Sequence, residues 1–125
     1  ASPLPGGILV LKATRKGEIL FANHGMVSLL ECDDYEDFIK YTGCSICRSI
    51  HPDDLEPMKK EFRRQLAAKY NKEHIDFLTY RMVTKKGHII QVESTARKSR
   101  NPFYGDLYYV YIYNRKDRLK ITGKK

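Results

Sequence analysis

Apolar and polar positions follow their clearest pattern between residues 52 and 66. Apolar residues recur there every three or four positions, with lysines and arginines between them: Leu55, Met58, Phe62 and Leu66. This spacing predicts an amphipathic helix with one buried face. Pro52 suits the first turn of a helix, and Asp53 and Asp54 place negative charge at its positive end. We therefore expect a helix from residue 52 to about residue 68 that lies on another layer of the protein.

Two short strands and two short helices are predicted before this helix. Residues 8–13 and 18–22 indicate a β-hairpin with Gly17 in its turn. Asn23 is a suitable N-cap for a first short helix, and Asp33 and Asp34 precede a second one. Gly43 then ends the second helix, so a hairpin and two short helices lead into the long helix.

Beyond the long helix and a polar loop at residues 69–73, the period of the pattern changes to two. The predicted strands are residues 75–84, 88–97 and 107–113. The first two form a hairpin around the turn Lys85-Lys86-Gly87, and a loop at residues 99–105 precedes the third. The element order is therefore two strands, a group of helices and three strands.

Composition fits a single globular domain. The chain has 125 residues, of which 42% are hydrophobic, enough for one core. Its apolar runs are far shorter than the roughly 20 residues that span a membrane, and its start lacks the pattern of a signal peptide. Three cysteines are too few for a disulfide framework. We expect a cytoplasmic location and no membrane contact by this segment, while the parent protein can be tethered elsewhere.

The net charge of +8 raises the question of a nucleic-acid partner. Most of it lies in residues 58–125, where 18 Lys and Arg outnumber 6 Asp and Glu. These charges alternate with apolar residues, as on a solvated face, and no DNA- or RNA-binding motif is present. We therefore expect no nucleic-acid partner. Retention on immobilised DNA that falls steeply with salt would be needed to support the nucleic-acid-binding hypothesis.

The succession of motifs along the chain resembles a PAS domain of bacterial sensory proteins. The motifs are GEILFAN, YEDFIKYTG, SIHPDDL, YRMVTKKGHIIQVES and GDLYYVYIYN. The resemblance covers residues 8–116, with a Pro and Gly linker at 1–7 and the frayed start of a linker to an output domain at 117–125. It implies an α+β fold, in which helices cover one face of a five-stranded antiparallel sheet with strand order 2-1-5-4-3.

The resemblance also implies a role. Similar PAS domains are non-catalytic sensory or regulatory modules that control an output domain through a small ligand or through homodimerisation. The motifs look most like those found with GGDEF-type diguanylate cyclases; a histidine kinase output and a purely structural interaction module without ligand are the alternatives. At Asn114-Arg115-Lys116 the chain lacks the aspartate-x-threonine signature that usually anchors the last strand, and Gln91 replaces a common tryptophan.

Strand parity, matched to the family, assigns two sets of candidate site residues. The inward set could line a ligand pocket, with Tyr80 and Ser94 as its polar groups: Phe62, Tyr80, Met82, Val92, Ser94, Val110 and Ile112. The alternative is a filled core. Tyr109, Tyr111 and Tyr113 face outward and predict an amphipathic platform for a second copy or a flanking helix, unless they pack within the sheet.

No cofactor, metal or catalytic site is predicted. Ile46 replaces the reactive cysteine of light-sensing relatives, and Met82, Val92 and Ile112 replace the amides that hold flavin. The histidines lie in polar or turn contexts unlike that of a haem ligand. A zinc set is conceivable but has no standard spacing: Cys32, Cys44, Cys47 and His51. We find no nucleophile and base at a sensible spacing, so this segment is predicted to be non-catalytic. The expected partners are a second copy of the chain and a covalently linked output domain, and an unidentified small ligand is a further candidate.

Overall fold

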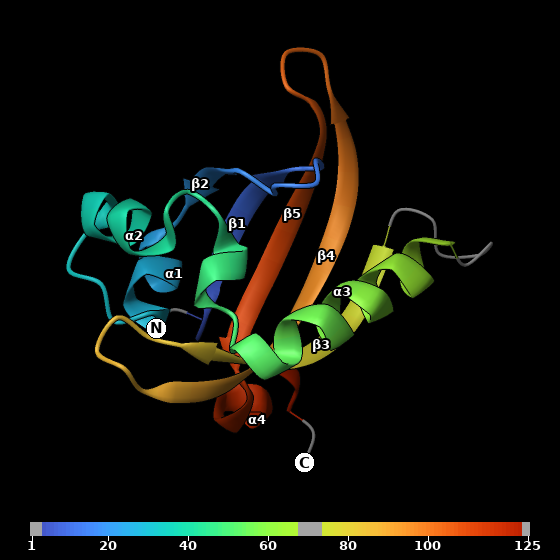
Figure 1. Cartoon of the computed structure of the whole chain (residues 1–125). Helices are drawn as coiled ribbons and strands as arrows, with labels where there is room; N and C mark the ends of the chain where they lie inside the picture. The colour runs from blue at the N-terminus through green and yellow to red at the C-terminus, as the bar shows by residue number, and fades with distance from the viewer. Residues whose placement is uncertain (1–3, 68–73, 124–125) are drawn as a thin grey trace.

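A five-stranded antiparallel sheet forms the centre of the protein (Figure 1). The computed structural model describes residues 4–67 and 74–123. The strands are β1 Gly7–Lys12, β2 Ile19–Ala22, β3 His74–Val83, β4 Ile89–Asn101 and β5 Gly105–Asn114. They lie in the order β2-β1-β5-β4-β3, and each neighbouring pair is antiparallel. The predicted fold class and strand order are therefore confirmed.

Helices cover one face of this sheet. In chain order they are α1 His24–Leu29, α2 Tyr35–Thr42, the 3-10 turn η1 Ile46–Ser49 and α3 Pro52–Ala67. Their apolar sides join the inward residues of the strands in one core, and Figure 1 shows α3 crossing in front of β3 and β4. The helix end expected near residue 68, the side chain of Leu66 and the loop 69–73 lie outside the described residues.

Short polar contacts begin and end these helices where the sequence predicts. Asn23 Oδ1 accepts the N–H of Met26 at 3.0 Å and the N–H of Ile8 at 2.9 Å, so the cap of α1 also ties the helix to β1. Asp34 caps α2, and Gly43 ends it in the left-handed region at a φ of 63°. No helix in residues 4–67 and 74–123 is long and apolar enough to cross a membrane.

The β4–β5 hairpin is longer than predicted. The loop expected at residues 99–105 is mostly strand, because pairing continues to Asn101 opposite Gly105. The turn is closed by Asn101 Oδ1, which accepts the N–H groups of Phe103 at 2.8 Å and Tyr104 at 3.0 Å. This local closure lets the strands run to the tip of the hairpin, which projects beyond the rest of the sheet in Figure 1.

The segment after β5 is also more ordered than predicted. A frayed segment was expected from about residue 117, but η2 Arg115–Asp117 and α4 Arg118–Thr122 follow the strand directly. Asn114 Oδ1 accepts the N–H of Lys116 at 3.0 Å and starts the turn. The short helix then carries Arg118 back to Glu93 of β4, a contact between distant residues that no local pattern reveals.

Candidate functional site

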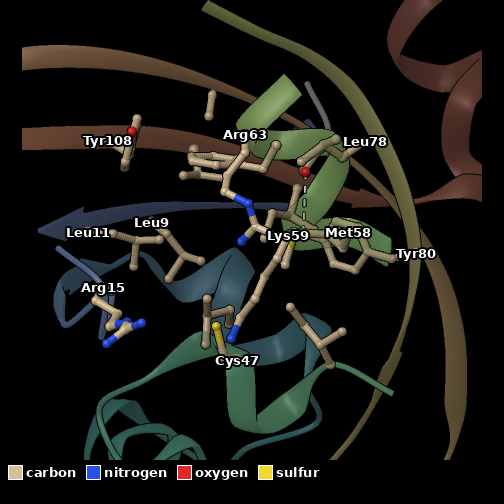
Figure 2. Close-up of a pocket in the computed structure, with 18 of the residues that line it drawn as sticks. Leu9, Leu11, Arg15, Cys47, Met58, Lys59, Arg63, Leu78, Tyr80 and Tyr108 are labelled. Carbon is tan, nitrogen blue, oxygen red and sulfur yellow. Dashed lines mark hydrogen bonds between the residues drawn. The ribbon is translucent and has the colours of Figure 1, made fainter. Parts of the chain in front are cut away.

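A pocket of about 560 Å³ opens between the inner face of the sheet, η1 and α3. Its interior is formed by side chains from four strands and α3, among them Leu9, Leu78, Val110, Met58 and Phe62. The ring of Phe62 meets Tyr108 of β5 edge to face, with ring centres 5.0 Å apart, which links α3 to the central strand of the sheet. Figure 2 shows Leu9, Met58, Leu78 and Tyr108 around the space.

Two hydroxyl groups lie in this otherwise apolar lining. Tyr80 of β3 donates a hydrogen bond to Ser94 Oγ of β4 at 3.3 Å, drawn as a dashed line in Figure 2. Burial raises the pKa of Tyr80 to about 12, so its hydroxyl stays neutral at physiological pH. The pair can therefore orient a polar group of a bound molecule without adding charge to the interior.

Most of the predicted pocket residues line this space, and two do not. Phe62, Tyr80, Ser94, Val110 and Ile112 are in the lining. Met82 and Val92 are instead fully buried in the packed core. Ile50 pairs with Met82 in an isolated β-bridge just before the chain enters α3, so Met82 lies beside this buried turn in the core.

Other lining residues were missed by the sequence reasoning. Leu9 and Leu11 follow from strand parity on β1, and Met58 follows from the helical stripe that contains Phe62. The basic residues Lys12, Arg15, Lys59 and Arg63 also border the pocket, and no pattern indicated them because they come from two separate segments.

The start of α3 is fixed to β3 by an ion pair. Asp54 accepts hydrogen bonds from the Arg81 backbone N–H at 2.7 Å, from Nε at 2.9 Å and from Nη2 at 2.7 Å. These bonds lower the pKa of Asp54 to about 2. The backbone N–H of His51 also donates to the carbonyl of Arg81 at 2.9 Å, so the helix that forms one wall of the pocket is held at its first turn.

The conceivable zinc ligands are not brought together. Cys32 is buried and its thiol donates to the carbonyl of Leu30 at 3.7 Å, whereas Cys44 is exposed and Cys47 lines the pocket. His51 Nδ1 accepts the N–H of Asp53 at 3.1 Å. In the part of the chain that the structure describes, no three His, Cys, Asp or Glu side chains gather in a way that could hold a metal ion.

The outer face of the sheet carries an exposed apolar patch. Ile8, Phe21 and Tyr109 are 43%, 50% and 46% exposed, and Val10 lies between them because it pairs with both Phe21 and Tyr109. Tyr111, half-buried, pairs with Ile8 and donates its hydroxyl to the Pro5 carbonyl at 2.5 Å. We call these five residues, Ile8, Val10, Phe21, Tyr109 and Tyr111, the outer apolar patch.

Tyr113 points to the same outer side but is not part of an open platform. It is 1% exposed, and its hydroxyl donates to Glu93 Oε1 at 2.6 Å. The predicted direction of its side chain is therefore right, and its predicted exposure is wrong. The reason is α4, which covers this end of the outer face through Arg118.

The comparison with protein families identifies the fold. The sequence model described as PAS fold matches residues 20–110, which is most of the chain. The chain belongs to the PAS-fold family. The match takes in α1, α2, η1, α3, β3 and β4 and ends within β5, whereas β1 and α4 of this PAS domain lie outside it. A search of curated proteins found no relative.

Solved structures similar to this PAS domain share its fold at low identity. A variant PAS-B domain of Drosophila melanogaster Cycle with bound glycerol is 17% identical, with a TM-score of 0.65 over 86% of this chain and 98% of that one. A sensory box histidine kinase/response regulator from Burkholderia thailandensis is 19% identical, with a TM-score of 0.64 over 92% and 80%. A PAS domain from Colwellia psychrerythraea is 24% identical, with a TM-score of 0.62 over 83% and 82%.

The exit from the last strand of this PAS domain is anchored by residues other than the family signature. Glu93 is 1% exposed and accepts hydrogen bonds from Arg118 Nε at 3.0 Å, from Arg118 Nη2 and from the Tyr113 hydroxyl. The Arg118 bonds lower the pKa of Glu93, and burial together with the bond to Glu93 raises the pKa of Tyr113 to about 12. An ion pair between the buried Glu93 and the partly exposed Arg118 thus joins β4 to the C-terminal helix, and the Tyr113 hydroxyl adds β5 to this contact.

Proposed function

We propose that this PAS domain is a non-catalytic sensory module that binds a small, mainly apolar molecule between the sheet and α3. The observation that carries the proposal is the pocket of about 560 Å³. Pockets of about 300–1,000 Å³ with an apolar lining and a few polar groups are typical of small-molecule sites. An open pocket of this size and lining between sheet and helix favours a ligand over the alternative of a purely structural module with a filled core.

The proposed signal passes from the pocket to the C-terminal exit through β4. Ser94 lines the pocket, and its neighbour Glu93 faces the opposite side of the sheet, where it binds Arg118 of α4. A ligand that moves this part of β4 would therefore alter the contact that holds α4. The output domain that we expect beyond the exit is a GGDEF-type diguanylate cyclase or a histidine kinase, in a cytoplasmic setting.

Native mass spectrometry, followed by the same measurement after denaturation, tests for the ligand. We expect a discrete extra mass that is lost on denaturation. The matched variant is Ala96→Leu, because Ala96 is 6% exposed and its side chain lines the pocket. Leucine there should occupy part of the pocket, reduce the extra mass by weakening ligand binding, and leave stability unchanged or increased.

The same variant separates a pocket from a filled core even when no ligand survives purification. In a filled core, the larger side chain would overpack and lower the unfolding free energy by about 1–3 kcal/mol. An Ala96→Leu protein destabilised to that extent, or one that retains the extra mass to the same extent as the unmutated protein, would contradict the proposal. Urea denaturation of both proteins measures the difference.

A second role, self-association, is favoured by the outer apolar patch. Three of its five side chains are more than two fifths exposed, and an exposed cluster of this kind commonly marks an interaction surface. We expect a homodimer that Tyr109→Glu converts to a monomer in analytical ultracentrifugation. The control is Tyr104→Glu, at the tip of the β4–β5 hairpin, where a 56% exposed ring lies away from the patch. If the unmutated domain stays monomeric at high concentration, this role is excluded.

A further inference from the structure

The charges around the pocket are almost all of one sign. Four basic side chains, Lys12, Arg15, Lys59 and Arg63, and one acidic side chain, Glu56, are among the lining residues, which gives this site a net charge of +3. Figure 2 shows Lys59 and Arg63 reaching from α3 into the space, and the guanidinium group of Arg15 facing it from the turn after β1. The cations therefore lie where a molecule would enter the pocket.

Two of these basic groups have an acidic partner within the protein, and two do not. Lys12 lies 3.9 Å from Glu18 and Lys59 lies 3.8 Å from Glu56, so each lysine forms a long ion pair. In the described part of the chain, Arg15 and Arg63 make neither an ion pair nor a side-chain hydrogen bond. Both guanidinium groups keep all their donors available for a bound anion.

Charge is confined to the opening, and the interior is apolar. Leu9, Leu78, Val110 and Ile112 line the deeper part, where the neutral Tyr80 and Ser94 hydroxyl pair is the polar feature. A molecule that satisfies both regions has an apolar body and an anionic end. Because a guanidinium group binds a carboxylate through two parallel hydrogen bonds, one carboxylate matches this opening well.

We propose that the pocket binds an apolar monocarboxylate, with its hydrocarbon body against the sheet and α3 and its carboxylate between Arg15 and Arg63. This inference rests on the proposed function, since it names the chemical class of the ligand for the same pocket. The body supplies affinity through burial of apolar surface, and the arginines select for the anion over a neutral molecule of the same shape.

Titration calorimetry with two matched pairs of probes tests this selection. The pairs are decanoate with decan-1-ol, and 2-naphthoate with 2-naphthylmethanol, each at low salt and neutral pH. We expect at least one acid to bind about fivefold more tightly than its alcohol, with a ratio that shrinks as salt is added.

Variants show whether the arginines cause the preference. Arg15→Gln and Arg63→Gln should each weaken binding of the acid about fivefold and leave binding of the alcohol unchanged. Lys60→Gln is the matched control, because Lys60 lies on α3 and loses the same charge but is not among the pocket-lining residues. It should change neither affinity.

The outcomes separate this inference from the proposed function. An acid and an alcohol that bind equally well, or an acid whose affinity falls equally in Lys60→Gln and Arg63→Gln, would overturn the anion preference while leaving a working ligand pocket. If none of the four probes binds, the anion inference is overturned, and the ligand-sensing function loses its support as well.

Discussion

Replacing Arg118 by methionine should lower the unfolding free energy by about 2 kcal/mol near neutral pH. Methionine keeps the apolar stem but leaves the buried carboxylate of Glu93 with the Tyr113 hydroxyl at 2.6 Å and with Arg115 Nε at 3.8 Å. Removing one partner of a fully buried pair costs about 3–5 kcal/mol. The side chain of Arg118 is 41% exposed, so water compensates part of that cost.

This loss of stability should depend on pH in a defined direction. The Arg118 bonds hold the pKa of Glu93 below its ordinary value of 4.5. The ion pair therefore stabilises the fold fully above that value and loses its contribution as pH falls through the lower pKa of the folded state. In Arg118→Met the unpaired carboxylate can take up a proton, which removes its penalty. The difference between the two proteins should shrink below about pH 4.

Urea denaturation followed by circular dichroism, near pH 7 and again near pH 3.5, measures both effects. The control is Lys120→Met, on the same short helix, whose amine lies 3.3 Å from Asp117 with a 70% exposed side chain. Such a surface pair should contribute less than about 0.5 kcal/mol. A loss in Arg118→Met as small as that of the control, or one that is the same at both pH values, would refute the reasoning.

Three further variants test other contacts. Asp54→Asn should lower the unfolding free energy by about 1 kcal/mol near neutral pH. The pKa of Asp54 is about 2 against an ordinary 3.8, so the difference in unfolding free energy between this variant and the unmutated protein should shrink as the pH is lowered from 3.8 to 2. Gly7→Ala should prevent folding or cost more than about 3 kcal/mol, since its added Cβ would lie 2.2 Å from the Met26 backbone; a normal melting temperature would exclude that close packing. Asn101→Ala should cost about 1 kcal/mol by removing two hydrogen bonds of the hairpin turn, and unchanged stability would show that the turn needs no side-chain closure.

Local signals in the sequence predicted the elements and their order well. Asn23, Asp34 and Gly43 act within one helical turn of their own positions, so their roles are readable without the rest of the fold. Alternation along each strand likewise put Tyr80 and Ser94 on one face, and the match to the family pattern identified that face as the inner one. The family resemblance supplied the strand order, which neither kind of signal contains.

The parts that were missed depend on contacts between distant segments. Met82 is buried in the core beside its bridge partner Ile50, which comes from a distant segment, and the outer side of Tyr113 is covered because Arg118 returns to Glu93. The basic opening brings Arg15 near α3, although 48 positions separate it from Arg63 in the numbering of the chain. Periodicity and motif spacing carry no information on such pairs.

The two sites that the structure places on β4 can be tested together by thermodynamic reciprocity. Ser94 lines the pocket and Glu93 holds α4, so a ligand that changes the Glu93–Arg118 contact must itself be bound with a different affinity when that contact is removed. Arg118→Met should therefore shift the affinity of the tightest-binding probe about threefold or more, whereas Lys120→Met should leave it unchanged. Equal affinities in all three proteins would mean that α4 anchors the end of β5 without receiving a signal from the pocket. A signal to an output domain would then have to pass through another surface, for which the outer apolar patch is the candidate.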